Sequence, residues 1–170
     1  MSECLKTNRL VCLDWATQQQ FSPQDEQLLQ CIIETVTEQA CQHLPGNWQP
    51  VNTKEEAVHW LKEREADGRL LFVIHQALQE PIGFVLLFEE FIKDKQHVNL
   101  GYLLSERFQG QGFGTELLNG FVEWRSRISE PQVIHAGVSV DNPGSIHLLE
   151  KAGFERVSVQ DSVLSYVLSI

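Results

Sequence analysis

Apolar residues recur along this chain with two different spacings, and the spacing predicts which segments are strands and which are helices. Alternation at every second position, or a short continuous apolar run, indicates a strand, whereas apolar residues three and four apart indicate a helix. The segments with strand spacing are 7–13, 69–76, 82–89, 98–104, 133–140, 154–160 and 162–169. The segments with helical spacing are 22–43, 53–68, 115–127 and 143–152.

Residues typical of helix ends support these boundaries. Ser22-Pro23-Gln24-Asp25 predicts a helix start, because serine is a good N-cap and proline suits the first helical position. This helix should run through His43 and end at Pro45-Gly46. Thr53-Lys54-Glu55-Glu56 matches the capping box, in which the first and fourth side chains bond each other's backbone N–H groups. Gly153 suits the left-handed residue that closes a helix.

The order of these elements predicts the fold class. A hairpin-length connection joins strands 69–76 and 82–89, whereas a helix joins strands 98–104 and 133–140, as in a parallel crossover unit. We therefore expect one α/β (α+β) domain spanning residues 1–170. It should contain a mixed, mostly antiparallel central sheet of six to seven strands with helices on both faces. The crossover unit places a loop at the carboxyl end of a strand, where such sheets usually bind ligands.

Composition and charge narrow the functional classes. The 170-residue chain carries a formal net charge of −10, which argues against the basic surface that nucleic-acid binding needs. An acidic chain suits a cationic partner, such as an amine or a basic peptide, although acidity also simply favours solubility. Its four cysteines form no CxxC pair, so we expect no metal site, and free thiols in a reducing cytoplasm. No apolar run is long enough to predict a membrane span.

The stretch Gln109-Gly110-Gln111-Gly112-Phe113-Gly114 carries the clearest chemical signal. Its alternating glycines can take positive φ and let a ligand approach the backbone, and Thr115 begins a predicted helix whose first N–H groups lack partners. These features predict a cradle for an anion such as a phosphate or pyrophosphate. A surface turn is the alternative. The stretch is not a Walker A loop, since no lysine follows Gly114, and it is not the GxGxxG dinucleotide fingerprint.

Three motifs in one order strengthen the ligand interpretation. Segment 109–114 fits the fixed positions of a Gln/Arg-x-x-Gly-x-Gly/Ala loop. Segments 141–145 (DNPGS) and 150–154 (EKAGF) are similar to an NPxS…EKxGF pattern, and segment 7–13 (TNRLVCL) is similar to a TxRLxLR start. In these motifs the chain resembles the GNAT superfamily of N-acetyltransferases. Within it, the chain looks most like the RimJ/RimL-like branch, which acetylates the N-termini of ribosomal proteins.

The resemblance implies acetyl-CoA as the donor. The cofactor's pyrophosphate would lie on backbone N–H groups of Gln109, Gly110, Gln111, Gly112, Phe113, Gly114 and Thr115. The pantetheine arm would pair with the strand end at Leu103 and Leu104, where a backbone N–H would polarise the thioester carbonyl. Asn142 would contact the arm from the opposite side of an opened sheet.

The resemblance also implies direct transfer of the acetyl group to a primary amine. Most of the rate acceleration should come from holding the two substrates in line. The expected acceptor is a protein N-terminal amine. A small amine, such as an aminoglycoside or a polyamine, is the first alternative, and a non-catalytic acyl-CoA-binding module is the second. The oligomeric state stays open, a homodimer included.

A general acid could protonate the departing CoA thiolate. Many members of the superfamily carry a tyrosine seven residues after the asparagine, but this chain has Leu149 there. In the ribosomal branch a serine at the position of Ser145 is the proposed acid, and this chain keeps it. The alternative role for Ser145 is that of a first-turn helix residue bonded to the backbone.

The general base has several candidates. Some N-terminal acetyltransferases carry a glutamate five places before the asparagine, where this chain has Gly137. His135 shares that strand face and has a suitable unperturbed pKa, and an ordinary strand histidine is its alternative role. Glu89, Glu90 and Glu106 are further candidates, as is a chain of water molecules without a single base.

Segment 44–53 should shape the acceptor site, because the family builds its acceptor wall between the first two helices. Trp48, Trp60 and Trp124 are expected in the core or in a groove wall rather than as substrate readers.

Overall fold

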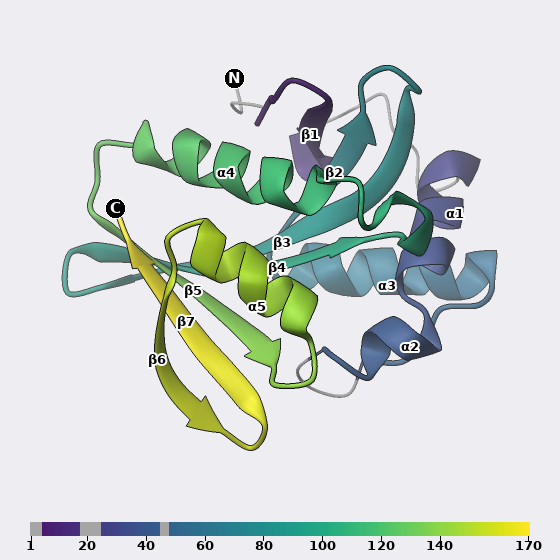
Figure 1. The fold of residues 1–170 in the computed structure, drawn as a ribbon. Coiled ribbons are helices and arrows are strands. Elements are labelled where there is room, and N and C mark those ends of the chain that lie inside the picture. The colour runs from purple at the N-terminus through teal and green to yellow at the C-terminus, as the bar shows by residue number, and fades with distance from the viewer. Residues whose placement is uncertain (1–4, 18–24, 45–47) are drawn as a thin grey trace.

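The computed structural model describes residues 5–17, 25–44 and 48–170, and Figure 1 shows their arrangement. A seven-stranded sheet in the order β1-β2-β3-β4-β5-β7-β6 runs through the centre. Its strands are β1 (Leu10–Asp14), β2 (Arg69–His75), β3 (Glu80–Ile92), β4 (Lys95–Leu104), β5 (Gln132–Ser139), β6 (Glu155–Gln160) and β7 (Val163–Ser169). The helices are α1 (Glu26–Thr35), α2 (Glu38–Cys41), α3 (Lys54–Asp67), α4 (Phe113–Ser126) and α5 (Pro143–Lys151), with 3-10 turns η1 (Trp15–Thr17) and η2 (Glu106–Phe108). Strands β4 and β5 are parallel and all other neighbours are antiparallel, which confirms the predicted mixed sheet.

Helices cover both faces of the sheet, with α4 and α5 on one face and α1 and α3 on the other (Figure 1). A strand covered on both faces needs apolar side chains on both faces, and β3 is an example. Val85 and Leu87 join the core beneath α4 and α5, whereas Phe84 and Leu86 join the core beneath α1 and α3. A strand buried on both faces reads as a continuous apolar run rather than an alternating one. Each fully buried side chain of this kind contributes about 1.5–3 kcal/mol.

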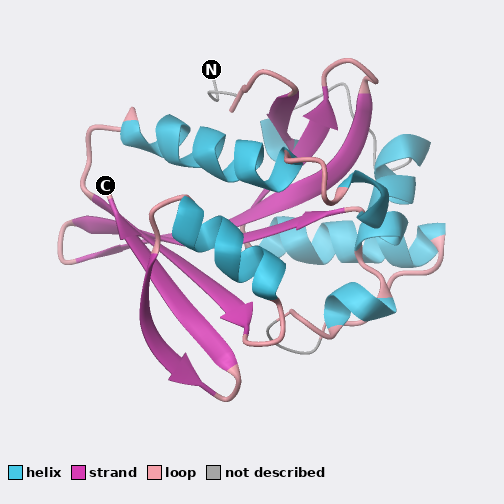
Figure 2. Ribbon diagram, in the orientation of Figure 1, coloured by secondary structure: helices cyan, strands magenta, loops and turns pink. Residues whose placement is uncertain are grey.

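The sheet opens between β4 and β5. Only residues 96–99 of β4 pair with β5, at residues 132–135. Beyond this short ladder, β4 continues to Leu104 while β5 pairs with β7 up to Ser139. Figure 2 shows the β5-β7-β6 group diverging from the other four strands. The opening leaves the last part of β4 without a strand partner on one side, and it positions the site described below.

The first predicted helix starts later than expected. Its N-cap is Asp25, whose Oδ1 accepts hydrogen bonds from the N–H groups of Gln27 and Leu28 at 3.0 and 3.3 Å. Ser22 was the expected N-cap and lies outside the described residues, as does the expected stop at Pro45-Gly46. Aspartate caps a helix as well as serine does, so the two starts could not be ranked from composition.

The same segment also forms two helices instead of one. The chain leaves α1 after Thr35, and Val36 turns its carbonyl to the N–H of Val51 at 2.9 Å. Thr37 then caps α2 by accepting a hydrogen bond from the N–H of Ala40 at 3.2 Å. Threonine side chains compete with helical hydrogen bonds in this way, and the long-range contact to Val51 decides the break.

Other boundaries agree more closely with the prediction. The first strand is Leu10–Asp14 rather than 7–13, and the capping box of Thr53 and Glu56 is present. Gly153 has φ 93°, as a left-handed closing residue should. Helix α4 begins at Phe113 instead of Thr115. None of the helices in the described ranges is both long and apolar enough to cross a membrane.

Candidate active site

The opening of the sheet is a cleft of about 1080 Å³ that extends from the glycine stretch to α2. The structure brings most of the expected site residues to this cleft. Those that line it are Leu103, Leu104, Gln109, Gly110, Gly112, Gly114, Thr115, His135, Asn142 and Ser145. Gln111 and Phe113 are not among its lining residues. Phe113 is a core residue with 4% of its surface exposed.

The glycine stretch ends as the N-terminus of α4. Gly110 and Gly112 have φ values of 70° and 81°, so both glycines adopt a backbone that other residues rarely take. Gly112 is the N-cap, which places the backbone N–H groups of Phe113 and Gly114 in the first helical turn along with that of Thr115. First-turn N–H groups have no partner inside the helix and suit an anion.

Close helix packing is a second reason for a glycine at position 114. A Cβ atom at this position would lie 2.8 Å from Cδ1 of Leu148, so the glycine lets α4 pack closely on α5. The loop before it is tied to the strand end, because Gln109 donates from Nε2 to the carbonyl of Leu104 at 2.9 Å. Gln111 similarly donates to the carbonyl of Arg107 at 2.7 Å. The two glutamine side chains therefore hold the loop by hydrogen bonds to neighbouring backbone carbonyls.

Arg9 supports the glycine stretch from the side of β1. Its Nε atom lies 2.6 Å from Oε2 of Glu116, and its Nη1 donates to the carbonyl of Gln111 at 3.2 Å. Its guanidinium carbon stands 4.2 Å above the ring of Phe113. Burial alone would raise the pKa of Glu116, but hydrogen bonds from Thr7 and Arg9, and the Arg9 charge, lower it overall. The sequence pattern does not predict this role of Arg9, because no local signal links residues so far apart in the chain.

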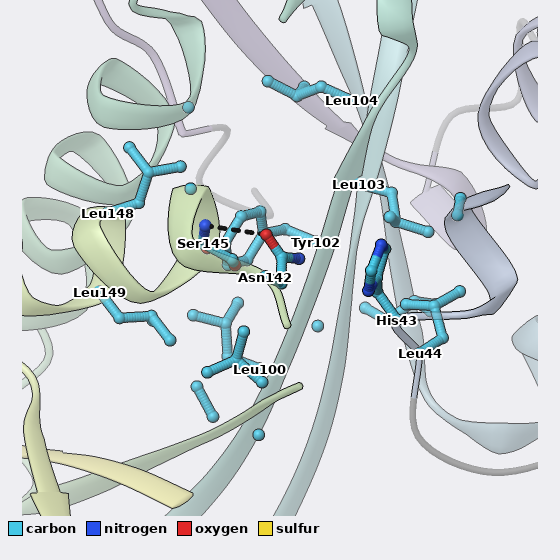
Figure 3. Close-up of a pocket in the computed structure, with 18 of the residues that line it drawn as sticks. His43, Leu44, Leu100, Tyr102, Leu103, Leu104, Asn142, Ser145, Leu148 and Leu149 are labelled. Carbon is cyan, nitrogen blue, oxygen red and sulfur yellow. Dashed lines mark hydrogen bonds between the residues drawn. The ribbon is translucent and has the colours of Figure 1, made fainter. Parts of the chain in front are cut away.

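Asn142 and Ser145 lie on the opposite wall of the cleft at the start of α5 (Figure 3). Asn142 is the N-cap, and its Oδ1 accepts a hydrogen bond from the N–H of Ser145 at 3.1 Å. The Ser145 hydroxyl lies 2.7 Å from the hydroxyl of Tyr102, which comes from β4. Burial raises the pKa of Tyr102, although the hydrogen bond to Ser145 acts in the other direction. Leu149 is buried in the core.

His135 stands where the β4–β5 ladder ends. Its Nε2 atom lies 2.9 Å from Nδ1 of His97, and the two rings stack at 5.1 Å. Burial lowers the pKa of His135 and the nearby His97 lowers it further, while Glu90 acts in the opposite direction. One ring must donate and the other accept, so at least one imidazole of the pair is neutral.

Two of the other base candidates, Glu89 and Glu90, do not line the cleft. Glu89 forms an ion pair with the fully buried Arg125 at 2.6 Å, so it belongs to a structural network. Glu90 faces His97 across the β3–β4 pair and does not line the cleft. Glu106 does line the cleft. Among the described residues, no group of three or more histidine, cysteine or acidic side chains could hold a metal ion.

The wall expected at 44–53 extends further toward the N-terminus. Leu44 and Trp48 line the cleft, and residues 45–47 lie outside the described ranges. Further lining residues come from α1, α2 and the neighbouring sheet: Glu34, Thr35, Thr37, Gln39, Ala40, His43, Phe84, Leu86, Phe88 and Asn99. Figure 3 shows His43 and Leu44 facing Ser145 and Asn142 across the cleft. Trp60 and Trp124 are core residues.

The fold matches those of solved acetyltransferase structures. A solved structure of RimL, a ribosomal alpha-N-protein acetyltransferase, in complex with coenzyme A matches with a TM-score of 0.73. It is 18% identical over 99% of this chain and 98% of that chain, and the match shows the shared fold. Residues 19–155 match the family model described as Acetyltransferase (GNAT) domain, so the chain belongs to this family.

Two curated relatives extend the comparison. A protein named Probable N-acetyltransferase YjcK from Bacillus subtilis is 35% identical over 106 residues, covering 62% of this chain and 52% of the relative. Spermidine N(1)-acetyltransferase from Vibrio cholerae is 31% identical over 84 residues, covering 49% of this chain and 47% of the relative. The chain therefore spans about half the length of these curated relatives.

Proposed function

We propose that this chain transfers an acetyl group from acetyl-CoA directly to a primary amine, and that the amine is the N-terminus of a protein or peptide. One observation carries the proposal. A single cleft joins an anion-binding helix terminus, the unpaired end of β4 and an acceptor wall of mainly neutral side chains. These three parts suit, in order, the pyrophosphate, the pantetheine arm and the acceptor.

The cofactor would bind along the first two parts. The pyrophosphate accepts hydrogen bonds from backbone N–H groups of residues 110–115, with the positive end of the α4 dipole behind it. The N–H of Gln109, also expected to donate here, is bonded to the carbonyl of Glu106 at 3.0 Å. The arm follows the free edge of β4 at Leu103 and Leu104, as an added strand would. A backbone N–H of this edge donates to the thioester carbonyl oxygen, where negative charge develops. Asn142 contacts the arm from the α5 side.

The reaction needs a base for the ammonium group and an acid for the thiolate. Ser145 Oγ is the proposed acid, since it lies on the cleft wall at the start of α5. His135 is the proposed base. The geometry allows this in one tautomer, in which His135 donates from Nε2 to His97 Nδ1 and keeps Nδ1 free to accept a proton.

The side chains of the acceptor wall favour a peptide N-terminus over a polyamine as the acceptor. Among the described lining residues the carboxylates are Glu34 and Glu106, and Glu34 is already paired with Arg107 at 3.3 Å. A polyamine with several charges would be better served by several unpaired carboxylates. The polar groups of Thr37 and Gln39 instead suit the neutral amides of a peptide backbone.

A polyamine acceptor is the second candidate. The relative from Vibrio cholerae is named for spermidine, and Glu38 and Glu106 line a shallow pocket beside the main cleft. These carboxylates could receive a second ammonium group. They could equally receive a basic side chain that follows a peptide N-terminus, so the pocket alone does not rank the two acceptors.

A direct comparison of acceptors tests the proposal. Release of the CoA thiol would be followed with acetyl-CoA and free-N-terminus peptides, the same peptides blocked by N-acetylation, and spermidine. We expect turnover with the free peptides and background rates with the blocked ones. Faster turnover with spermidine than with any peptide would replace the peptide acceptor by a polyamine. Binding of acetyl-CoA without turnover on any acceptor would indicate a non-catalytic module.

A further inference from the structure

The hydroxyl groups of Tyr102 and Ser145 form one hydrogen-bonded pair on the wall of the cleft. They lie 2.7 Å apart and come from different elements, since Tyr102 is on β4 and Ser145 is in the first turn of α5. Figure 3 shows both side chains beside Asn142. The pair therefore spans the gap where the sheet opens, and both residues line the cleft.

The direction of this hydrogen bond decides what Ser145 can do. A serine hydroxyl has one proton, and if that proton points to Tyr102 it cannot be given to a leaving group. A phenol is a stronger acid than an aliphatic alcohol and is thus the better donor. A partly buried tyrosine hydroxyl also needs a partner, and Ser145 Oγ lies within hydrogen-bond distance of it. With Tyr102 as the donor and Ser145 as the acceptor, the Ser145 proton is free to face the cleft.

We infer that Tyr102 is a positioning residue for the acid: its hydroxyl donates to Ser145 Oγ and so directs the Ser145 proton toward the sulfur that leaves acetyl-CoA. This inference rests on the proposed function. As the carbon–sulfur bond breaks, its electron pair goes to sulfur, and the Ser145 oxygen–hydrogen bond breaks as a sulfur–hydrogen bond forms. The attacking nitrogen gives up a proton as the amide forms, and that proton restores Ser145. The pair ends the cycle unchanged.

Asn142 completes the arrangement by fixing the serine from the backbone side. Its Oδ1 accepts from the Ser145 N–H at 3.1 Å, so the backbone of Ser145 is held while Tyr102 holds the side chain. Leu149 is apolar and cannot supply the proton that relatives take from a tyrosine there. The β4 tyrosine thus compensates for the missing α5 tyrosine without taking over its position.

The test uses Tyr102→Phe, Ser145→Ala and the double variant of the full chain. We expect Tyr102→Phe to lower kcat about three- to tenfold, a fraction of the roughly 100-fold or more that a positioned acid can supply. The Kd for CoA and the KM for acetyl-CoA should stay within about twofold, because the ring remains in place. Ser145→Ala should lower kcat at least as much. In the Ser145→Ala background, Tyr102→Phe should have no further effect.

Tyr166→Phe is a matched control. Tyr166 is a buried tyrosine that lines the same cleft, and its hydroxyl also reaches α5. It donates to Glu150 at 2.8 Å and not to Ser145. This variant should keep kcat. Two results would overturn the inference and leave the proposed function standing. One is that Tyr102→Phe lowers kcat by the same factor with Ser145 present and with Ser145→Ala. The other is that Tyr102→Phe leaves kcat unchanged in an otherwise active chain. An unaltered chain that binds acetyl-CoA but transfers acetyl to no acceptor would overturn the proposed function, and the inference with it.

Discussion

The Nε atom of Arg9 lies 2.6 Å from Oε2 of Glu116, although 107 positions separate the two residues in the chain. Glu116 sits in the first turn of α4, and Arg9 also bonds the carbonyl of Gln111 and covers the ring of Phe113. The side chain of Arg9 therefore links the beginning of β1 to both sides of the glycine stretch. In the proposed cofactor site, Arg9 would hold the loop through these contacts.

Arg9→Ala should consequently weaken binding of CoA by about tenfold, because the loop loses the contacts that preorganise it. Binding of pantetheine, which lacks the pyrophosphate, should change by less than about twofold. Calorimetric titration with both ligands measures the difference. Arg127→Ala is the matched control, since Arg127 forms an exposed pair with Glu123 in the same helix. Equal losses for both ligands would argue against a role confined to the phosphate loop.

Glu116 should make the fold sensitive to acid. Because its pKa is lower in the folded chain than the ordinary value of 4.5, the folded state favours the carboxylate. Its contribution to stability is then present above pH 4.5 and is lost as the pH falls through the folded pKa. Glu116→Gln should be less stable at pH 7 and should lose less further stability below pH 4.5. Chemical denaturation at several pH values measures this, and parallel curves for the two proteins would contradict it.

Two substitutions of Gly112 distinguish the effect of backbone strain from the effect of charge in the proposed anion site. Gly112→Ala places a Cβ on a residue with φ 81°, which should cost about 1 kcal/mol of stability. Gly112→Asp adds a negative charge where pyrophosphate binds and should abolish detectable CoA binding. Affinity measured on folded protein distinguishes the two effects. A folded Gly112→Asp variant with unchanged affinity would remove this stretch from the cofactor site.

His135 should give the activity an acidic limb below pH 6.5, because its pKa is lowered from that ordinary value. In the proposed mechanism the neutral imidazole is the base, so the rate should fall as the pH drops through the folded pKa. An acceptor amine with a pKa of about 7.7–8 titrates at higher pH and stays distinguishable. His135→Asn should lower kcat/KM about 10- to 100-fold and remove this limb.

Two further imidazoles serve as comparisons for that profile. His59 is exposed on α3, so His59→Asn should leave the profile unchanged. His43 faces the cleft from the acceptor wall. If His43→Asn removed the acidic limb and His135→Asn did not, the base would be His43 and the assignment of His135 would be wrong.

Trp48 tests the acceptor wall. It lines the cleft and its ring packs edge-on against Trp60 at 5.8 Å. Trp48→Ala should raise the KM for the peptide several-fold and leave the KM for acetyl-CoA unchanged. Steady-state kinetics with each substrate varied in turn measures both constants. An unchanged KM for the peptide would show that the acceptor enters elsewhere.

Local pattern in the sequence determined most of the elements and the position of the candidate ligand loop. Apolar runs such as 82–89 predict strands buried on two faces, and the capping box at Thr53 and Glu56 predicts the start of α3, because both signals act between neighbours in the chain. The positive φ of Gly110 and Gly112 follows from glycine chemistry in the same way. The mixed sheet and the left-handed glycines were therefore predictable, and the anion cradle stays a prediction.

Only the tertiary structure decided which distant side chains meet. The break between α1 and α2 depends on a hydrogen bond from Val51, and the support of the glycine stretch depends on Arg9 reaching α4. Tyr102 faces Ser145 because β4 and β5 separate, and no local pattern encodes that separation. Side-chain partners across a sheet are set by packing and register. For this reason the sequence alone indicated the glycine stretch as a candidate cofactor loop but did not indicate the residue proposed to orient the acid.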